Sequence, residues 1–157
     1  METGKEKNDR PRLVSINTSE KKGEIKTPVP EARVREDFGI EGDVHAGSEV
    51  KQVSLLDGSE INEMEEKAGI ELKPGDFAEN LTTEGLTLED FPVGARIMVG
   101  DEVELEVSQI GKTCHDGCAI MEKTGDCIMP RKGLFFRVLT GGTITPGDEI
   151  KLIEGEN

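Results

Sequence analysis

Residues 92–107 read Pro-Val-Gly-Ala-Arg-Ile-Met-Val-Gly-Asp-Glu-Val-Glu-Leu-Glu-Val and give the clearest β-strand pattern in the chain. Two apolar-rich runs are joined at residues 100–101, where a glycine interrupts the pattern. In the second run Val103, Leu105 and Val107 alternate with glutamates, so one face of the strand is apolar and the other is charged. The pattern predicts a β-hairpin with one face in the core and one face in water.

Short strands are also predicted on both sides of this hairpin, with turn-forming glycines and prolines between them. They lie at residues 13–16, 52–56, 77–83, 134–139 and 149–153. One helix is expected after Asp57, with Ile61, Met64 and Ala68 near helical spacing and Gly69 at its end. We therefore predict a mostly β fold, a closed or barrel-like domain with one or two short helices.

The predicted domain spans residues 12–154, preceded by a polar, flexible segment at residues 1–11. The 157-residue chain has 19 Lys and Arg against 33 Asp and Glu, a net charge of −14, which disfavours nucleic acid and anionic membranes as partners. It contains no apolar run of the roughly 18–20 residues that cross a bilayer. Three cysteines without a secretory signal indicate reduced thiols and a cytoplasmic location.

All three cysteines fall within residues 114–127, together with one of the two histidines. Thiolates are the reactive form of cysteine, and a nearby cation favours them. Lys112 and His115 could therefore activate Cys114 or Cys118, which have polar and glycine neighbours. The alternative is that the cysteines fill core space, and this alternative is strongest for Cys127, which precedes Ile128 and Met129.

The same residues also permit a zinc site, because Cys114, His115, Cys118 and Cys127 supply four nitrogen and sulfur ligands. Adjacent cysteine and histidine side chains rarely reach one ion together, however, and the usual pair of cysteines separated by two residues is absent. We therefore rank zinc below a thiol function.

Several separated motifs resemble those of one family in the same order. They are Gly-Asp-x-His-Ala-Gly at 42–47, Gly-Asp-Phe-Ala-Glu-Asn-Leu at 75–81, Cys-His-x-x-Cys-x-Ile at 114–120, Gly-Asp-Cys-x-Met-Pro at 125–130 and Pro-Gly-Asp-x-Ile at 146–150. Together the motifs resemble the small stand-alone MOSC domains, named for the C-terminal domain of molybdenum cofactor sulfurase. The resemblance implies a β-barrel-like fold that binds molybdenum cofactor or carries sulfur on a cysteine.

The resemblance also implies roles for individual residues. The cysteine that begins the Cys-x-Ile strand is Cys118, the first choice for metal ligand or persulfide carrier, and Cys114 is the second. Asn80 matches a cofactor-contacting asparagine of larger relatives, although Phe77-Ala78-Glu79 replaces the Arg-Pro before it. His45, with Gly42 and Gly47, is expected in the pocket wall, where glycine backbone N–H groups could meet an anion.

A phosphate-bearing pterin needs local positive charge in so acidic a protein. We expect Lys112, Arg131 and Arg137 to provide it beside Cys118, and we expect lysines between residues 1 and 26 to matter less than Lys112. The chain has no segment that resembles a pyridoxal-phosphate desulfurase. The predicted partners are therefore molybdenum cofactor or a pterin precursor, and a separate cysteine desulfurase or molybdenum enzyme. The sequence leaves open whether the protein is an enzyme or only a binding and delivery module.

Overall fold

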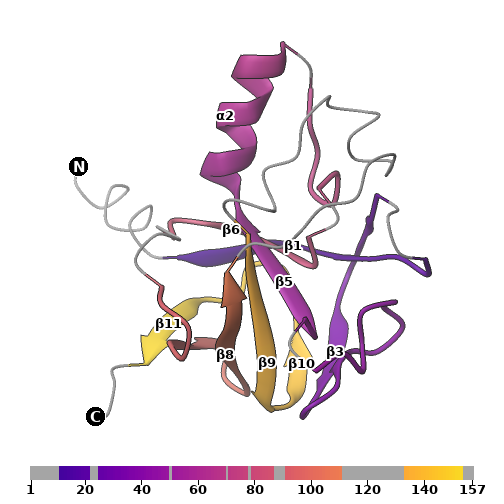
Figure 1. Ribbon diagram of the computed structural model, residues 1–157, viewed down its shortest axis with the longest axis vertical. Helices are drawn as coiled ribbons and strands as arrows, with labels where there is room; N and C mark the ends of the chain where they lie inside the picture. The colour runs from indigo at the N-terminus through magenta and orange to yellow at the C-terminus, as the bar shows by residue number, and fades with distance from the viewer. Residues whose placement is uncertain are drawn as a thin grey trace.

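The computed structural model describes residues 11–21, 25–49, 51–69, 71–77, 79–86, 91–110 and 133–153. The cysteine stretch, from residue 111 to residue 132, lies outside these ranges. The described residues form two β-sheets and one α-helix, α2 (Gly58–Ala68), which projects from one end of the strands in Figure 1. The prediction of a mostly β fold with a short helix is confirmed.

The larger sheet contains eight strands in the order β11-β7-β8-β9-β5-β6-β1-β2. Their bounds are β1 (Arg12–Thr18), β2 (Thr27–Val29), β5 (Val53–Asp57), β6 (Leu81–Glu84), β7 (Arg96–Val99), β8 (Val103–Ile110), β9 (Leu134–Thr140) and β11 (Ile150–Ile153). The smaller sheet has the order β10-β3-β4, with β3 (Ala32–Arg35), β4 (Gly39–Ile40) and β10 (Gly142–Ile144). The predicted hairpin is present as β7 and β8, which pair antiparallel from Arg96↔Glu106 to Val99↔Val103.

The prediction of a closed barrel is not confirmed, because strand pairing in the large sheet runs from β11 at one edge to β2 at the other. The start of β1, the strand next to β2, meets the residue before β11 at an isolated bridge, Arg12↔Glu149. Beyond this bridge β11 pairs with β7 along its whole length, while β1 continues with β2 and β6 as neighbours. The sheet is curved, but its first and last strands do not form a continuous ladder.

Helix α2 makes the crossover between β5 and β6, which are parallel neighbours in the sheet. Asp57 caps its first turn by accepting from the Ser59 backbone N–H at 3.2 Å, and Gly69 ends it in the left-handed conformation. Both boundaries agree with the sequence prediction. No helix in the described part of the chain is long and apolar enough to cross a membrane.

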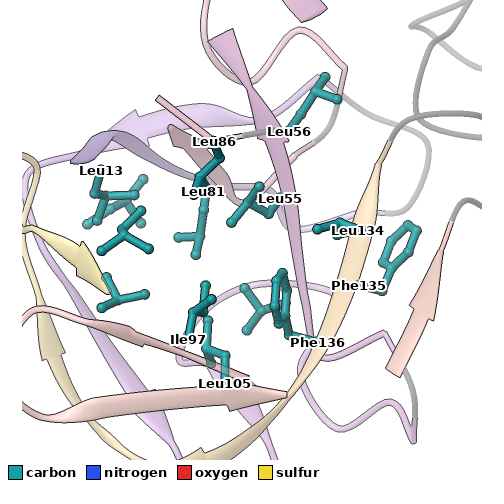
Figure 2. Packing of buried hydrophobic residues seen from close by; sticks show 14 of the residues in the cluster. Leu13, Leu55, Leu56, Leu81, Leu86, Ile97, Leu105, Leu134, Phe135 and Phe136 are labelled. Carbon is teal, nitrogen blue, oxygen red and sulfur yellow. The ribbon is translucent and has the colours of Figure 1, made fainter. Parts of the chain in front are cut away.

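The core lies inside the curve of the large sheet, where Leu13, Leu55, Leu81, Ile97 and Leu105 gather in Figure 2. Leu105 and Ile97 come from the hairpin, and Phe136 comes from β9. Figure 2 shows Phe135 on the opposite side of β9 from Phe136, as strand alternation requires. Burying apolar side chains of this size stabilises a fold by about 1.5–3 kcal/mol each.

One predicted strand is shorter than expected. We predicted residues 77–83 as a strand, but β6 begins at Leu81 and residues 74–77 form a turn. The reason is that two backbone N–H groups of this turn donate to the buried Glu79 carboxyl group. The Gly75 nitrogen is 2.9 Å from Oε2, and the Phe77 nitrogen is 3.2 Å from Oε1. The backbone donors of Gly75 and Phe77 therefore bond to a side chain, and the ladder with β1 and β5 is formed from Leu81 onward.

Candidate functional site

The first polar cluster lies just after the end of β1 and just before the start of β2, beside the loop that follows β4. Thr18 pairs with Thr27, so the next residues along each strand, Ser19 and Lys26, lie across from each other. The Ser19 carbonyl accepts from the Val44 backbone N–H at 2.9 Å, which fixes the loop against the hairpin. Strand pairing thus places Ser19 beside Lys26, and the bond to Val44 adds a loop whose Asp43 lies 17 residues after Lys26 in the sequence.

Lys26 is the centre of this cluster and is buried, as is its partner Asp43. The Lys26 ammonium nitrogen, Nζ, lies 2.8 Å from Asp43 Oδ1, 2.9 Å from Ser19 Oγ and 3.3 Å from His45 Nδ1. The side chains of Lys26 and Asp43 are 0 % exposed, whereas that of His45 is 21 % exposed. The cluster therefore combines a fully desolvated ion pair with a histidine that reaches solvent.

Asp43 remains ionised although it is buried. Burial alone would raise the pKa of its carboxyl group, but hydrogen bonds from Lys26 and from the His45 backbone N–H, together with the charge of Lys26, outweigh this effect. The pKa of Asp43 therefore lies well below its ordinary value. The carboxylate also accepts from the Ser19 backbone N–H at 3.1 Å and the His45 backbone N–H at 3.0 Å.

The loop at residues 42–47 uses its backbone donors internally. The N–H groups of residues 43 to 48 all donate to protein acceptors, including the Ser19 carbonyl, the Phe38 carbonyl and the Asp43 carboxylate. The backbone donors that we expected this loop to offer to an anion are therefore already engaged from residue 43 onward. A cofactor-binding role for Gly42 and Gly47 stays a prediction, and the side chain of His45 is the polar group that the loop exposes.

Asn80 belongs to a second polar cluster, in the middle of the large sheet. Its Oδ1 accepts from the Ser54 backbone N–H at 2.9 Å, and its Nδ2 donates to the Asn17 carbonyl at 3.1 Å. The residue is 0 % exposed. These bonds join β5 to β1 beside the start of β6, so the contacts observed for Asn80 are structural. Its expected contact with a cofactor stays a prediction.

Glu79 supports the first cluster through the 74–77 turn. Its Oε2 accepts from the Gly75 N–H and from Thr82 Oγ at 2.6 Å, while the Gly75 carbonyl accepts from the Lys26 backbone N–H at 2.9 Å. Gly75 has φ +93°, and a Cβ there would collide with the Lys26 carbonyl oxygen, so this close approach requires glycine. Glu79 thus holds the turn on which the Lys26 backbone rests.

Burial raises the pKa of Glu79, and hydrogen bonds from Gly75 and Thr82 only partly offset that effect. A folded-state pKa above the unfolded value means that folding takes up a proton, so the contribution of Glu79 to stability falls as pH rises through the folded pKa. We expect the stability difference between the wild type and Glu79→Gln to change in favour of the variant from pH 5 to pH 8. Urea unfolding at both pH values measures this difference, with Glu63→Gln on the exposed face of α2 as control. A difference that is the same at both pH values would contradict the prediction.

Comparison with known proteins identifies the family. Residues 41–151 match the sequence model of the MOSC domain, which is most of the chain. The chain belongs to the MOSC domain family. The match begins just before the Asp43–His45 loop and includes the whole cysteine stretch, so the predicted membership is confirmed.

Solved MOSC-like structures share the fold. YiiM from Geobacillus stearothermophilus is 28 % identical with a TM-score of 0.74, and the alignment covers 92 % of this chain and 75 % of that one. The YuaD protein from Bacillus subtilis is 19 % identical with a TM-score of 0.71, covering 93 % and 97 %. YiiM from Escherichia coli is 19 % identical with a TM-score of 0.66, covering 94 % and 71 %. No curated protein matches the sequence.

The structure of this MOSC domain places only some of the predicted site residues. His45 contacts Lys26, and Arg137 lies on β9 with its Nε 4.0 Å from Asp37 Oδ1. The other predicted residues lie outside the described part of the chain: Lys112, Cys114, His115, Cys118, Cys127 and Arg131. The described residues contain no group of three or more His, Cys, Asp or Glu side chains that could hold a metal ion. The zinc alternative involves residues outside this part and stays untested.

Sequence reasoning missed Lys26, Asp43 and Glu79. We expected lysines before position 27 to matter less than Lys112, yet Lys26 is buried in direct contact with His45. A signal for Asp43 and Glu79 was present, because both lie inside the motifs at 42–47 and 75–81. No local pattern marks Lys26, which is charged, precedes Thr-Pro and resembles a surface residue in sequence.

Proposed function

We propose that this MOSC protein handles molybdenum cofactor or transfers sulfur to a metal–sulfur centre, with Cys118 as the persulfide carrier or molybdenum ligand and Cys114 as the second candidate. The observation that carries the proposal is the family match over residues 41–151, which includes both the cysteine stretch and the His45 loop. Lys112 and His115 are proposed to favour the Cys118 thiolate, because a neighbouring cation or base lowers the thiol pKa.

The donor set suits the proposed ligand. A thiolate is a soft ligand, and a sulfur-rich metal centre accepts it readily. When bound, molybdenum cofactor would supply the metal centre and the pterin phosphate. Cys118 would hold the metal, and His45, Arg131 and Arg137 are the proposed polar contacts to the rest of the group. In a protein of net charge −14 such contacts must be local, because the overall field repels an anion.

The proposed sulfur transfer needs no external oxidant, because one S–S bond forms as another breaks. The Cys118 thiolate attacks the outer sulfur of a persulfide on a separate cysteine desulfurase. A new S–S bond forms on Cys118, the S–S bond of the donor breaks, and the donor cysteine leaves as a thiolate. The step needs a reduced thiol, which is the basis for proposing the cytoplasm as its location.

Incubation with a cysteine desulfurase, its pyridoxal cofactor and free cysteine tests the proposal. We expect intact-mass spectrometry to show the addition of one sulfur atom to the full-length chain, and reduction with dithiothreitol to remove it. An incubation without cysteine is the control. If no sulfur is added, the transfer function is wrong, and the alternative of a non-catalytic cofactor-binding and delivery module is favoured.

A further inference from the structure

The contacts of Lys26 restrict the state of the His45 ring. An ammonium group has three N–H donors and no acceptor. Its neighbours include Asp43 Oδ1, Ser19 Oγ and His45 Nδ1, at 2.8, 2.9 and 3.3 Å. Because Lys26 can only donate, the nitrogen of His45 that faces it must be the acceptor. A neutral imidazole that accepts at Nδ1 carries its proton on Nε2.

The competing arrangement would place a proton on Nδ1 and direct it toward Asp43 Oδ2. That oxygen is 3.6 Å from Nδ1, farther than Lys26 Nζ, and it already accepts from the His45 backbone N–H at 3.0 Å. In that arrangement the Nδ1–H group and the Lys26 ammonium would be two donors facing each other at 3.3 Å, which is unfavourable. The shorter distance and the absence of an acceptor on Lys26 both favour Lys26 as the donor to Nδ1.

We propose that Lys26 is a positioning residue that holds His45 as the neutral tautomer protonated on Nε2, so that His45 presents a fixed N–H donor to the ligand site. Lys26 and Asp43 are 0 % exposed on their side chains and His45 is 21 % exposed. The His45 side chain is therefore the one member of this trio that keeps contact with solvent. The ligand group suited to this donor is an acceptor atom, such as an oxyanion oxygen.

The neighbouring backbone strengthens the assignment. The backbone N–H groups of residues 43 to 48 are engaged within the protein, so a donor from the 43–47 segment has to come from the His45 ring. A ring protonated on Nε2 cannot act as a base or metal ligand at that nitrogen without first losing its proton. The inference rests on the proposed function for the identity of the ligand, but the tautomer is a property of the protein alone.

Long-range proton–nitrogen correlation NMR on the full-length, nitrogen-15-labelled protein near pH 7.5 tests the tautomer without any cofactor. The chain has only two histidines, so His115→Gln removes one set of ring signals and assigns the other to His45. We expect a protonated Nε2 and an unprotonated Nδ1. A ring protonated on Nδ1, or on both nitrogens, would overturn the proposal. Failure of the persulfide experiment would leave this result unchanged, so the two outcomes are distinguishable.

Two variants test whether Lys26 is the cause. Lys26→Arg keeps a buried cation that can donate to Nδ1, and should keep the tautomer. Lys26→Met combined with Asp43→Asn removes both members of the ion pair, so no buried charge is left without a partner. In this double variant we expect a mixture of the two neutral tautomers or a doubly protonated ring. If the double variant keeps a single tautomer protonated on Nε2, the assignment of a positioning role to Lys26 is wrong.

Discussion

Asp43→Ala should lower the free energy of unfolding by about 3–5 kcal/mol, the usual loss when one member of a buried ion pair is removed. Typical domains are stable by only about 5–15 kcal/mol, so much of the variant would unfold at moderate urea concentration. The loss is large because Asp43 accepts from Lys26 Nζ and from the backbone N–H groups of Ser19 and His45. Alanine leaves an ammonium group and two N–H groups without this acceptor.

Glu84→Gln is the matched control for Asp43→Ala. Glu84 pairs with Arg12 at 2.6 Å, but the two side chains are 46 % and 45 % exposed. Solvent screens such a pair, so this variant should lose less than about 1 kcal/mol. Urea unfolding curves of the wild type and both variants give the comparison. If both variants lose the same free energy of unfolding, burial of the Lys26–Asp43 pair does not make it more important for stability than an exposed pair.

The destabilisation by Asp43→Ala should also depend on pH. The folded-state pKa of Asp43 is depressed, so its stabilising contribution is fully present above the unfolded pKa of about 3.9 and is lost as pH falls toward the folded pKa. The stability difference between the wild type and Asp43→Ala should therefore be constant from pH 5 to pH 7 and shrink below about pH 4. A difference that grows in acid would contradict this assignment.

The sequence was most informative where local chemistry determines structure. The alternation at 103–107 predicted β8, and Asp57 and Gly69 predicted the two ends of α2. Each of these features depends on neighbouring residues along the chain. Closure of the sheet depends instead on how β1 and β11 meet at residues 12 and 149, and no local pattern reports a pairing over that separation.

The candidate site was only partly predictable for the same reason. The glycines and histidine at 42–47 led us to predict a ligand-binding loop, but glycine content alone does not reveal whether its N–H groups are available. In the structure the N–H groups of the loop donate to acceptors on Phe38, Asp43 and Ser19, among others. The contact between Lys26 and His45 becomes visible only once the β1–β2 pairing and the loop after β4 are placed together. The structure therefore shows the loop with its backbone N–H groups engaged and with the His45 ring beside a buried lysine.

Cys118→Ser should abolish sulfur loading by a cysteine desulfurase, whereas Cys127→Ser should leave loading nearly intact. Cys118 follows a glycine, lies three residues from His115 and begins the Cys-x-Ile motif of the MOSC family, while Cys127 precedes Ile128 and Met129. A thiolate in polar surroundings is reactive, and a thiol among apolar side chains is inert. Serine keeps nearly the same size but cannot form a persulfide, so the comparison isolates the chemistry of sulfur.

The measurement is the fraction of chain that gains one sulfur atom by intact mass, followed by peptide mapping of the modified cysteine. Loading should fall to background in Cys118→Ser and remain near the wild-type level in Cys127→Ser, and Cys114→Ser tests the second candidate. Equal losses at positions 118 and 127 would remove the basis for choosing Cys118. Stoichiometric zinc that is released only when all three thiols are blocked would instead restore the zinc alternative, because shared coordination makes the cysteines act as one unit.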